Sequence, residues 1–97
     1  MPLYTFFLEY GGGTYVSQVE ASDEMEAPQK WASNFDLHIT PDYEKLFERD
    51  FRKKLIESLD LNLVAELQDL INTWAWSAYR LEKPATIHFT KTVAIEL

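Results

Sequence analysis

Residues 3–21 read LYTFFLEYGGGTYVSQVEA, and this stretch decides the fold. The three glycines of the chain stand together here, between segments rich in the aromatic and β-branched residues that strands prefer. Glycine adopts the positive φ angles that a tight turn needs, so Leu3–Tyr10 and Thr14–Ala21 are predicted to form a β-hairpin. The glycine run is not a phosphate-binding loop, because such loops end in Lys-Ser or Lys-Thr and open a helix.

Two helices are predicted after the hairpin. Ser22 and Asp23 suit an N-cap, so a helix is expected from near Glu26 to about Asn34. Its buried residues are expected to be Met25, Trp31 and Ala32. A Thr-Pro start and an apolar stripe at spacings of three and four predict a second helix over about residues 41–58. Residues 61–72 fit a short third helix or a strand, and we favour the helix.

The last two strands are predicted over Thr73–Leu81 and Ala85–Ile95, where Trp, Tyr, Thr, Ile and Val gather. The order of elements is then β-β-α-α-(α)-β-β. This order is typical of an α+β protein with a four-stranded antiparallel sheet and two or three helices packed on one face. The length of 97 residues fits a single domain over residues 1–97.

The two faces of the last hairpin depend on the length of its loop. A three-residue loop, Glu82-Lys83-Pro84, would set Leu81 opposite Ala85. Aliphatic and aromatic side chains such as Ile87 and Phe89 would then face the helices. The outward face would carry a predicted interface made of Trp74, Trp76, Arg80, His88 and Thr90, because exposed aromatic patches are typical of interfaces. Another loop length is the alternative, since a slip of one residue would bury the tryptophans.

The charge balance limits the partners that can be expected. The net charge is −7, and nine of the sixteen acids lie in residues 1–48. Such a chain is not expected to bind nucleic acid or a membrane surface, whereas a basic protein would be attracted. Four acids form an acidic rim at Glu20, Asp23, Glu24 and Glu26. They suit a solvated helix start or, alternatively, a docking patch for a basic partner.

Few residues suggest catalysis or a cofactor. The chain has no cysteine and only two histidines, so a Cys-ligated zinc site and a thiol nucleophile are excluded. We predict no metal site, no cofactor and no enzymatic activity. The basic cluster of Arg49, Arg52, Lys53 and Lys54 is interleaved with acids, which favours a charge-paired helix face over RNA contact.

Residues 4–32 resemble the opening of HicB-type antitoxins, a small protein family. The shared layout is a strand, a glycine turn, a second strand and then a Ser/Asp-x-x-Glu-Ala helix start, here Ser22-Asp-Glu-Met-Glu-Ala27. The Pro-Gly segment of that family and its separate DNA-binding region have no counterpart here. The resemblance implies an antitoxin-like role, and the overall layout is also similar to many small bacterial α+β proteins.

These observations favour a cytoplasmic, non-enzymatic interaction module that forms a homodimer through its aromatic sheet face. An antitoxin-like or immunity-like role is one version. The alternative is a small-molecule binding or enzymatic domain with a pocket near Trp76, Arg80 and His88, which would suit an anionic or aromatic ligand.

Overall fold

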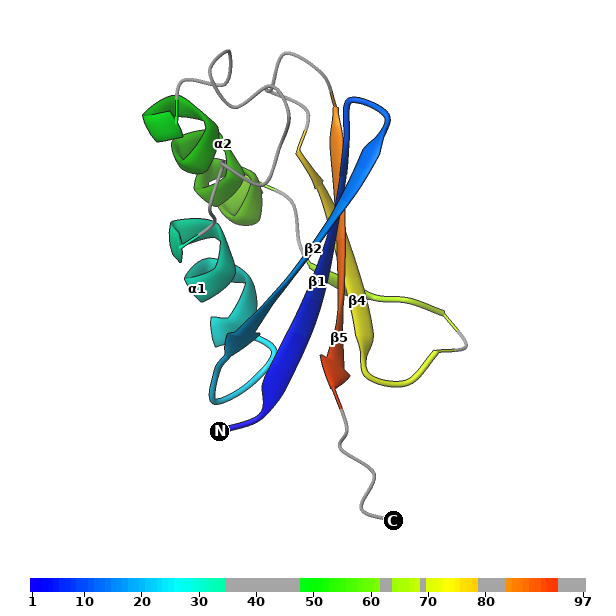
Figure 1. Cartoon of the computed structure of the whole chain (residues 1–97). Coiled ribbons are helices and arrows are strands. Elements are labelled where there is room, and N and C mark those ends of the chain that lie inside the picture. The colour runs from blue at the N-terminus through cyan, green and yellow to red at the C-terminus, as the bar shows by residue number, and fades with distance from the viewer. Residues whose placement is uncertain (35–47, 62–63, 69, 79–83, 93–97) are drawn as a thin grey trace.

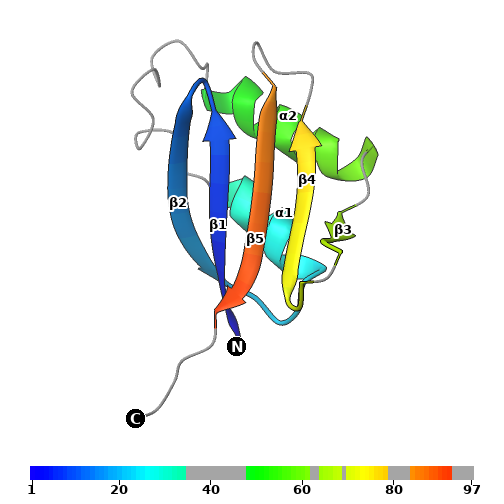
Figure 2. The same cartoon turned by 90° about the vertical axis from the view of Figure 1, so that its right-hand side faces the viewer.

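The computed structural model describes residues 1–34, 48–61, 64–68, 70–78 and 84–92, and within them the element order is β-β-α-α-β-β-β. The elements are β1 (Leu3–Tyr10), β2 (Gly13–Glu20), α1 (Glu26–Asn34), α2 (Glu48–Leu61), β3 (Ala65–Glu66), β4 (Thr73–Ala78) and β5 (Ala85–Thr92). The strands form one antiparallel sheet in the order β2-β1-β5-β4-β3, with both helices on the same side (Figures 1 and 2). The predicted α+β class is confirmed, but the sheet has five strands rather than four.

The N-terminal hairpin is confirmed. Its register runs from Leu3 opposite Glu20 to Tyr10 opposite Gly13, which leaves a two-residue turn. Gly11 and Gly12 have φ angles of 58° and 85°, the signs that a type I′ turn requires at both central positions. The turn therefore sets the register of the hairpin, and with it the side of the sheet to which each residue of β2 points.

The helix α1 begins at Glu26, as predicted. The Asp23 carboxylate accepts hydrogen bonds from the backbone N–H groups of Met25 (3.0 Å) and Glu26 (2.8 Å), so Asp23 caps the helix. Pro28 lies in the first turn, where its missing N–H group breaks no helical bond. Trp31 and Ala32 are buried as expected. The prediction that Met25 is buried is wrong, because this residue precedes the first turn and is 74% exposed.

The helix α2 is described from Glu48 to Leu61, and the predicted start at residues 41–47 lies outside the described residues. Leu55 and Ser58 are buried, and Leu59 packs against the core. These three residues have the spacing of one helical face. The helix packs against α1 and β4, so the two helices together form the second layer of the molecule (Figure 1).

The predicted third helix is wrong within the described part of residues 61–72. Ala65 and Glu66 instead form β3, which pairs with Ala75 and Trp74 of β4. Val64 packs against the core, but Leu67, Leu70 and Ile71 are exposed. The edge of β4 offers unpaired backbone groups, with which Ala65 and Glu66 pair. Asn72 has a φ of 59° immediately before β4.

The core contains a row of stacked aromatic rings that runs from α1 across the covered face of the sheet. Trp31 of α1 stacks on Phe6 of β1 with ring centroids 5.0 Å apart, and Phe6 stacks on Phe89 of β5 at 4.6 Å. Phe89 in turn stacks on Trp74 of β4 at 5.2 Å. Stacked aromatic pairs stabilise a core beyond their buried area. The row ties three strands and one helix into a single unit.

Candidate functional site

The register of β4 and β5 differs from the predicted one and reverses the faces of β4. Ala78 lies opposite Ala85, and Trp76 lies opposite Ile87. The prediction placed Leu81 opposite Ala85, so the pairing is shifted by three residues. Since side chains alternate with a period of two, an odd shift moves every side chain of β4 to the other face.

Trp76 therefore points toward the helices, and the prediction that it lies on an outward face is wrong. It is only 4% exposed and lies edge-on to the rings of Phe6, Trp31 and Phe89 at 5.8–6.4 Å. Its indole Nε1 donates a hydrogen bond to Ser58 Oγ on α2 at 3.0 Å. Trp74 points to the same side, where it is half-buried. The alternative with buried tryptophans describes this hairpin correctly.

His88 and Thr90 remain on the outward face, as predicted, because β5 keeps the expected alternation. Trp76 and His88 thus lie on opposite sides of the sheet. A pocket lined by both residues does not form, which corrects the predicted ligand site. Arg80, the third residue of that pocket, lies outside the described residues.

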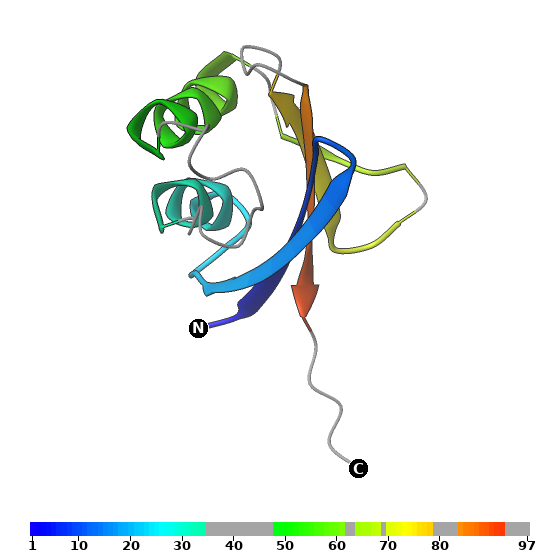
Figure 3. The same cartoon turned by 45° about the horizontal axis from the view of Figure 1, so that its top comes forward.

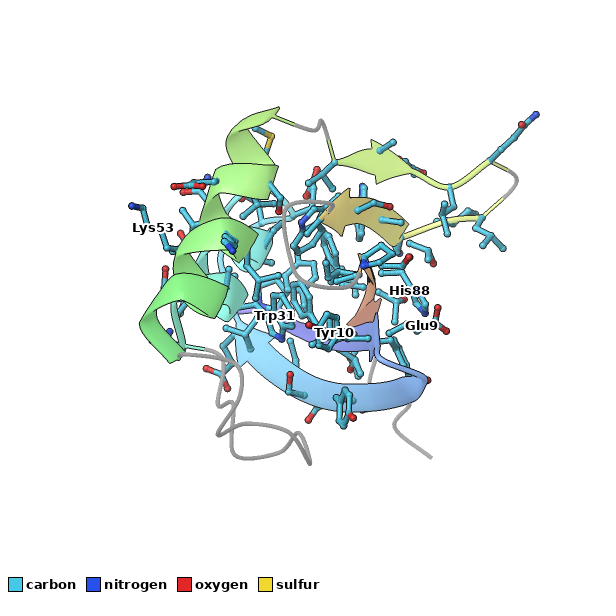
Figure 4. All side chains as sticks on the ribbon, turned by 90° about the horizontal axis from the view of Figure 1, so that it is seen from above. Glu9, Tyr10, Trp31, Lys53 and His88 are labelled. Carbon is cyan, nitrogen blue, oxygen red and sulfur yellow. The ribbon has the colours of Figure 1, made fainter. Side chains whose placement is uncertain are left out.

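We call the side of the sheet away from the helices the open face (Figure 2). Its residues come from all five strands: Leu3, Thr5, Phe7 and Glu9 of β1, Thr14, Val16, Gln18 and Glu20 of β2, Ala65 of β3, Thr73, Ala75 and Ser77 of β4, and Thr86, His88, Thr90 and Thr92 of β5. None of the described helices covers it (Figure 1). Figure 4 shows Glu9 and His88 on this side, and Tyr10, Trp31 and Lys53 on the other.

The centre of the open face is a stacked pair. The rings of Phe7 and His88 lie 5.4 Å apart and nearly parallel at 21°. Beside them, the hydroxyls of Thr5 and Thr92 share a hydrogen bond, and Gln18 Nε2 donates to Thr5 Oγ1 at 3.0 Å. These contacts hold the side chains of three strands in place, so the polar groups of this surface are already oriented.

The open face carries little charge for such an acidic chain. Glu9 and Glu20 are the only charged residues among the strand residues that form it, and neither is on β4 or β5. Threonine, serine and alanine make up most of the rest. A second protein can approach this centre without meeting the repulsion that the net charge of −7 produces elsewhere.

The loop between β3 and β4 adds apolar surface on the same side. Its described residues, 67, 68 and 70–72, lie on the side of the sheet away from the helices (Figures 1 and 3). Leu70 is 51% exposed and Ile71 is 85% exposed. Backbone hydrogen bonds from Leu67 N to Thr73 O and from Lys91 N to Asn72 O hold both ends of the loop. Sequence analysis missed this feature because it assigned these residues to a helix.

Two carboxylates of the acidic rim, those of Asp23 and Glu26, accept hydrogen bonds within the fold. Asp23 caps α1, and Glu26 accepts a hydrogen bond from the Ser22 hydroxyl at 2.9 Å. Glu20 ends β2 on the open face. Glu24 has no hydrogen bond or ion pair within the described part of the chain, and it lines a pocket that also includes Glu66 and Trp74.

The pKa of Tyr4 reflects the negative charges at the start of α1. Burial raises the pKa of its phenol above the usual value of 10.0, and the negative charges of Glu24 and Asp23 raise it further. The Tyr4 ring lies 6.3 Å from the Trp74 ring. The negative potential of Glu24 and Asp23 therefore reaches Tyr4, which lies beside the pocket residue Trp74.

The described residues contain no group of three His, Cys, Asp or Glu side chains that could hold a metal ion. Neither described helix is long and apolar enough to cross a membrane. In the basic cluster on α2, Lys53 Nζ lies 4.0 Å from Glu57 Oε1, and the side chains of Arg49 and Arg52 are not among those described.

Comparison with known proteins adds no relative: no protein-family model, no curated protein and no solved structure matches this chain.

Proposed function

We propose that this chain is a non-enzymatic interaction module that forms a homodimer through its open face. The main support is that a sheet surface with few charged residues and an exposed apolar loop lie on the same side of a chain with a net charge of −7. Interfaces are depleted in charge at their centre and enriched in aromatic residues, and the Phe7–His88 pair fits that description.

A second copy of this chain is the partner that the open face favours. Two acidic chains repel one another over most of their surfaces, and the centre of the open face is where this repulsion is weakest. In a two-fold arrangement, the 67–72 loop of each copy would lie over the sheet of the other, because the same patch must serve both partners. Leu70 and Ile71 would then be buried in the dimer.

An antitoxin-like or immunity-like role is one form of this proposal, supported by the resemblance of residues 4–32 to HicB-type antitoxins. In that form, the dimer presents its remaining surface to a further protein.

The test is the mass in solution, measured by light scattering over a dilution series. The wild-type chain is expected to form a dimer of two 11.3 kDa chains that dissociates on dilution. The Ile71→Glu variant is expected to be monomeric at the same concentrations. Association of the wild type should strengthen between 50 and 300 mM salt, because salt screens the repulsion between two acidic chains.

The matched control is Ile56→Glu on α2, which changes the same residue type to the same charge on the helical side, where Ile56 is 39% exposed. This variant is expected to dimerise like the wild type. A wild-type chain that stays monomeric would overturn the proposal, as would an Ile56→Glu variant that dissociates as readily as Ile71→Glu.

A further inference from the structure

A pocket lies on the helical side of the sheet, separate from the open face. Its volume is about 360 Å³, which is near the lower end of the roughly 300–1,000 Å³ typical of ligand sites. The described residues that line it are Glu24, Met25, Pro28, Gln29, Leu59, Val64, Glu66 and Trp74. They come from the start of α1, the end of α2, β3 and β4, so the packing of four elements creates the cavity.

The chemistry of the lining has two parts. Leu59, Val64 and Pro28 provide an aliphatic wall, and Trp74 adds an indole ring that is held by stacking on Phe89. Glu24 and Glu66 add two exposed carboxylates, neither of which has an ion-pair partner among the described side chains. No basic residue is among the described lining residues.

We infer that this pocket binds the side chain of an arginine or lysine from a basic segment of another protein. Such a side chain combines an apolar stem with a cationic head, which matches the aliphatic wall and the two carboxylates. Tryptophan is also the aromatic residue that attracts cations most strongly. The match in shape and charge therefore favours a basic side chain over a neutral or anionic ligand.

The surroundings favour a protein segment over a small free amine. Asp23 and Glu24 are close enough to Tyr4 to raise its pKa, so negative potential extends beyond the carboxylates at the pocket itself. Each positive charge of a peptide would be stabilised by this wider field, whereas a small amine with one charge would gain that stabilisation only once. This inference does not depend on dimer formation, because the pocket and the open face are on opposite sides of the sheet.

The first experiment is calorimetric titration with an acetylated, amidated peptide Gly-Arg-Gly-Arg-Gly and with its citrulline counterpart. Citrulline keeps the shape of arginine and removes its charge. We expect the arginine peptide to bind, with a change in the fluorescence of Trp74 that is lost in Trp74→Phe. Binding should weaken as salt rises, opposite to the salt dependence expected for the dimer. Equal binding of the citrulline peptide would overturn the inference.

The second experiment removes the carboxylates one at a time. Glu24→Gln and Glu66→Gln are each expected to weaken peptide binding by about fivefold, since an exposed charge pair at about 4 Å in water is worth about 1 kcal/mol. Glu9→Gln is the matched control, because it removes the same charge from the open face and should leave binding unchanged. Equal effects of Glu24→Gln and Glu9→Gln on peptide binding would mean that the peptide responds only to the overall charge of the protein. That result would overturn the proposed site.

Free n-butylguanidinium, a small alkyl-guanidinium with a single positive charge, distinguishes the two sources of the cation. It is expected to bind at least tenfold more weakly than the peptide. Butylguanidinium binding as tight as that of the peptide would overturn the assignment to a protein segment and would identify a site for a small free cation instead.

Discussion

The two faces of the sheet share the same five strands but are built on different principles. The face covered by the helices is held together mainly by stacked aromatic rings. On the open face, threonines surround the stacked pair of Phe7 and His88. Burial determines stability on the first face, and composition and charge determine what the second can bind. A substitution should therefore change folding on one face and association on the other.

The largest effect is expected at Trp76. Replacement by alanine removes a buried indole from between three aromatic rings and should lower the free energy of unfolding by about 3–5 kcal/mol, as truncation of buried aromatics does. Phe7→Ala on the open face is the control and should lower it by less than about 1 kcal/mol, while it weakens the dimer. Urea denaturation of both variants measures the difference. Similar losses would mean that the two faces do not differ in this way.

The hydrogen bond between Trp76 and Ser58 should have the next largest effect. Ser58→Ala leaves a buried indole N–H without this acceptor, and such a loss destabilises a protein by about 1–3 kcal/mol. The control is Ser17→Ala, which removes the acceptor 2.8 Å from Trp31 Nε1. Ser17 is partly exposed, so water can replace the hydroxyl and the loss should be smaller. Equal losses from the two substitutions would contradict a distinction based on burial.

The N-cap that Asp23 forms for α1 should have a smaller effect on stability than the buried hydrogen bond of Trp76. Asp23→Ala removes the acceptor for two backbone N–H groups and should destabilise the protein by about 1 kcal/mol. Asp23→Asn keeps the cap and should retain most of the stability. Thermal unfolding followed by circular dichroism distinguishes the two variants. If both lose the same stability, the charge of Asp23 matters and its capping bond does not.

The sequence was sufficient for the hairpin and for the start of α1, because both depend on local chemistry. The positive φ angles of Gly11 and Gly12 and the cap at Asp23 involve residues close in the chain. The faces of β5 could also be predicted, since the alternation of Ile87 and Phe89 with His88 leaves only one apolar side.

The faces of β4 could not be predicted, because Trp74, Ala75 and Trp76 suit either side of a sheet. The register alone decides between the two sides, and residues 79–84 carry no turn motif that fixes it. The error at β3 has a similar cause. The leucine spacing there fits a helix, but the free edge of β4 binds this segment as a strand, which is a long-range effect. The pocket requires four elements that no local pattern brings together.

At neutral pH the smallest effect is expected at Tyr4 on the covered face, because its contribution should be confined to alkaline pH. Its pKa is raised in the folded protein, first by burial and then by Glu24 and Asp23. Below pH 10 the phenol is protonated in both states and contributes no pH dependence. As the pH rises above 10, the unfolded chain releases this proton first, so the free energy of unfolding falls by up to about 1.4 kcal/mol per pH unit until the folded pKa is passed.

Tyr4→Phe should therefore lose less stability between pH 8 and pH 11 than the wild type, as measured by urea denaturation at each pH. Glu24→Gln should give an intermediate result, because it removes one of the charges that raise the pKa and leaves the burial unchanged. Equal losses in the wild type and Tyr4→Phe would mean that the buried phenol does not couple to folding. The effect of Glu24 and Asp23 on the Tyr4 phenol would then have no measurable consequence for stability. The negative potential inferred for the pocket would depend on the carboxylates of Glu24 and Glu66 alone.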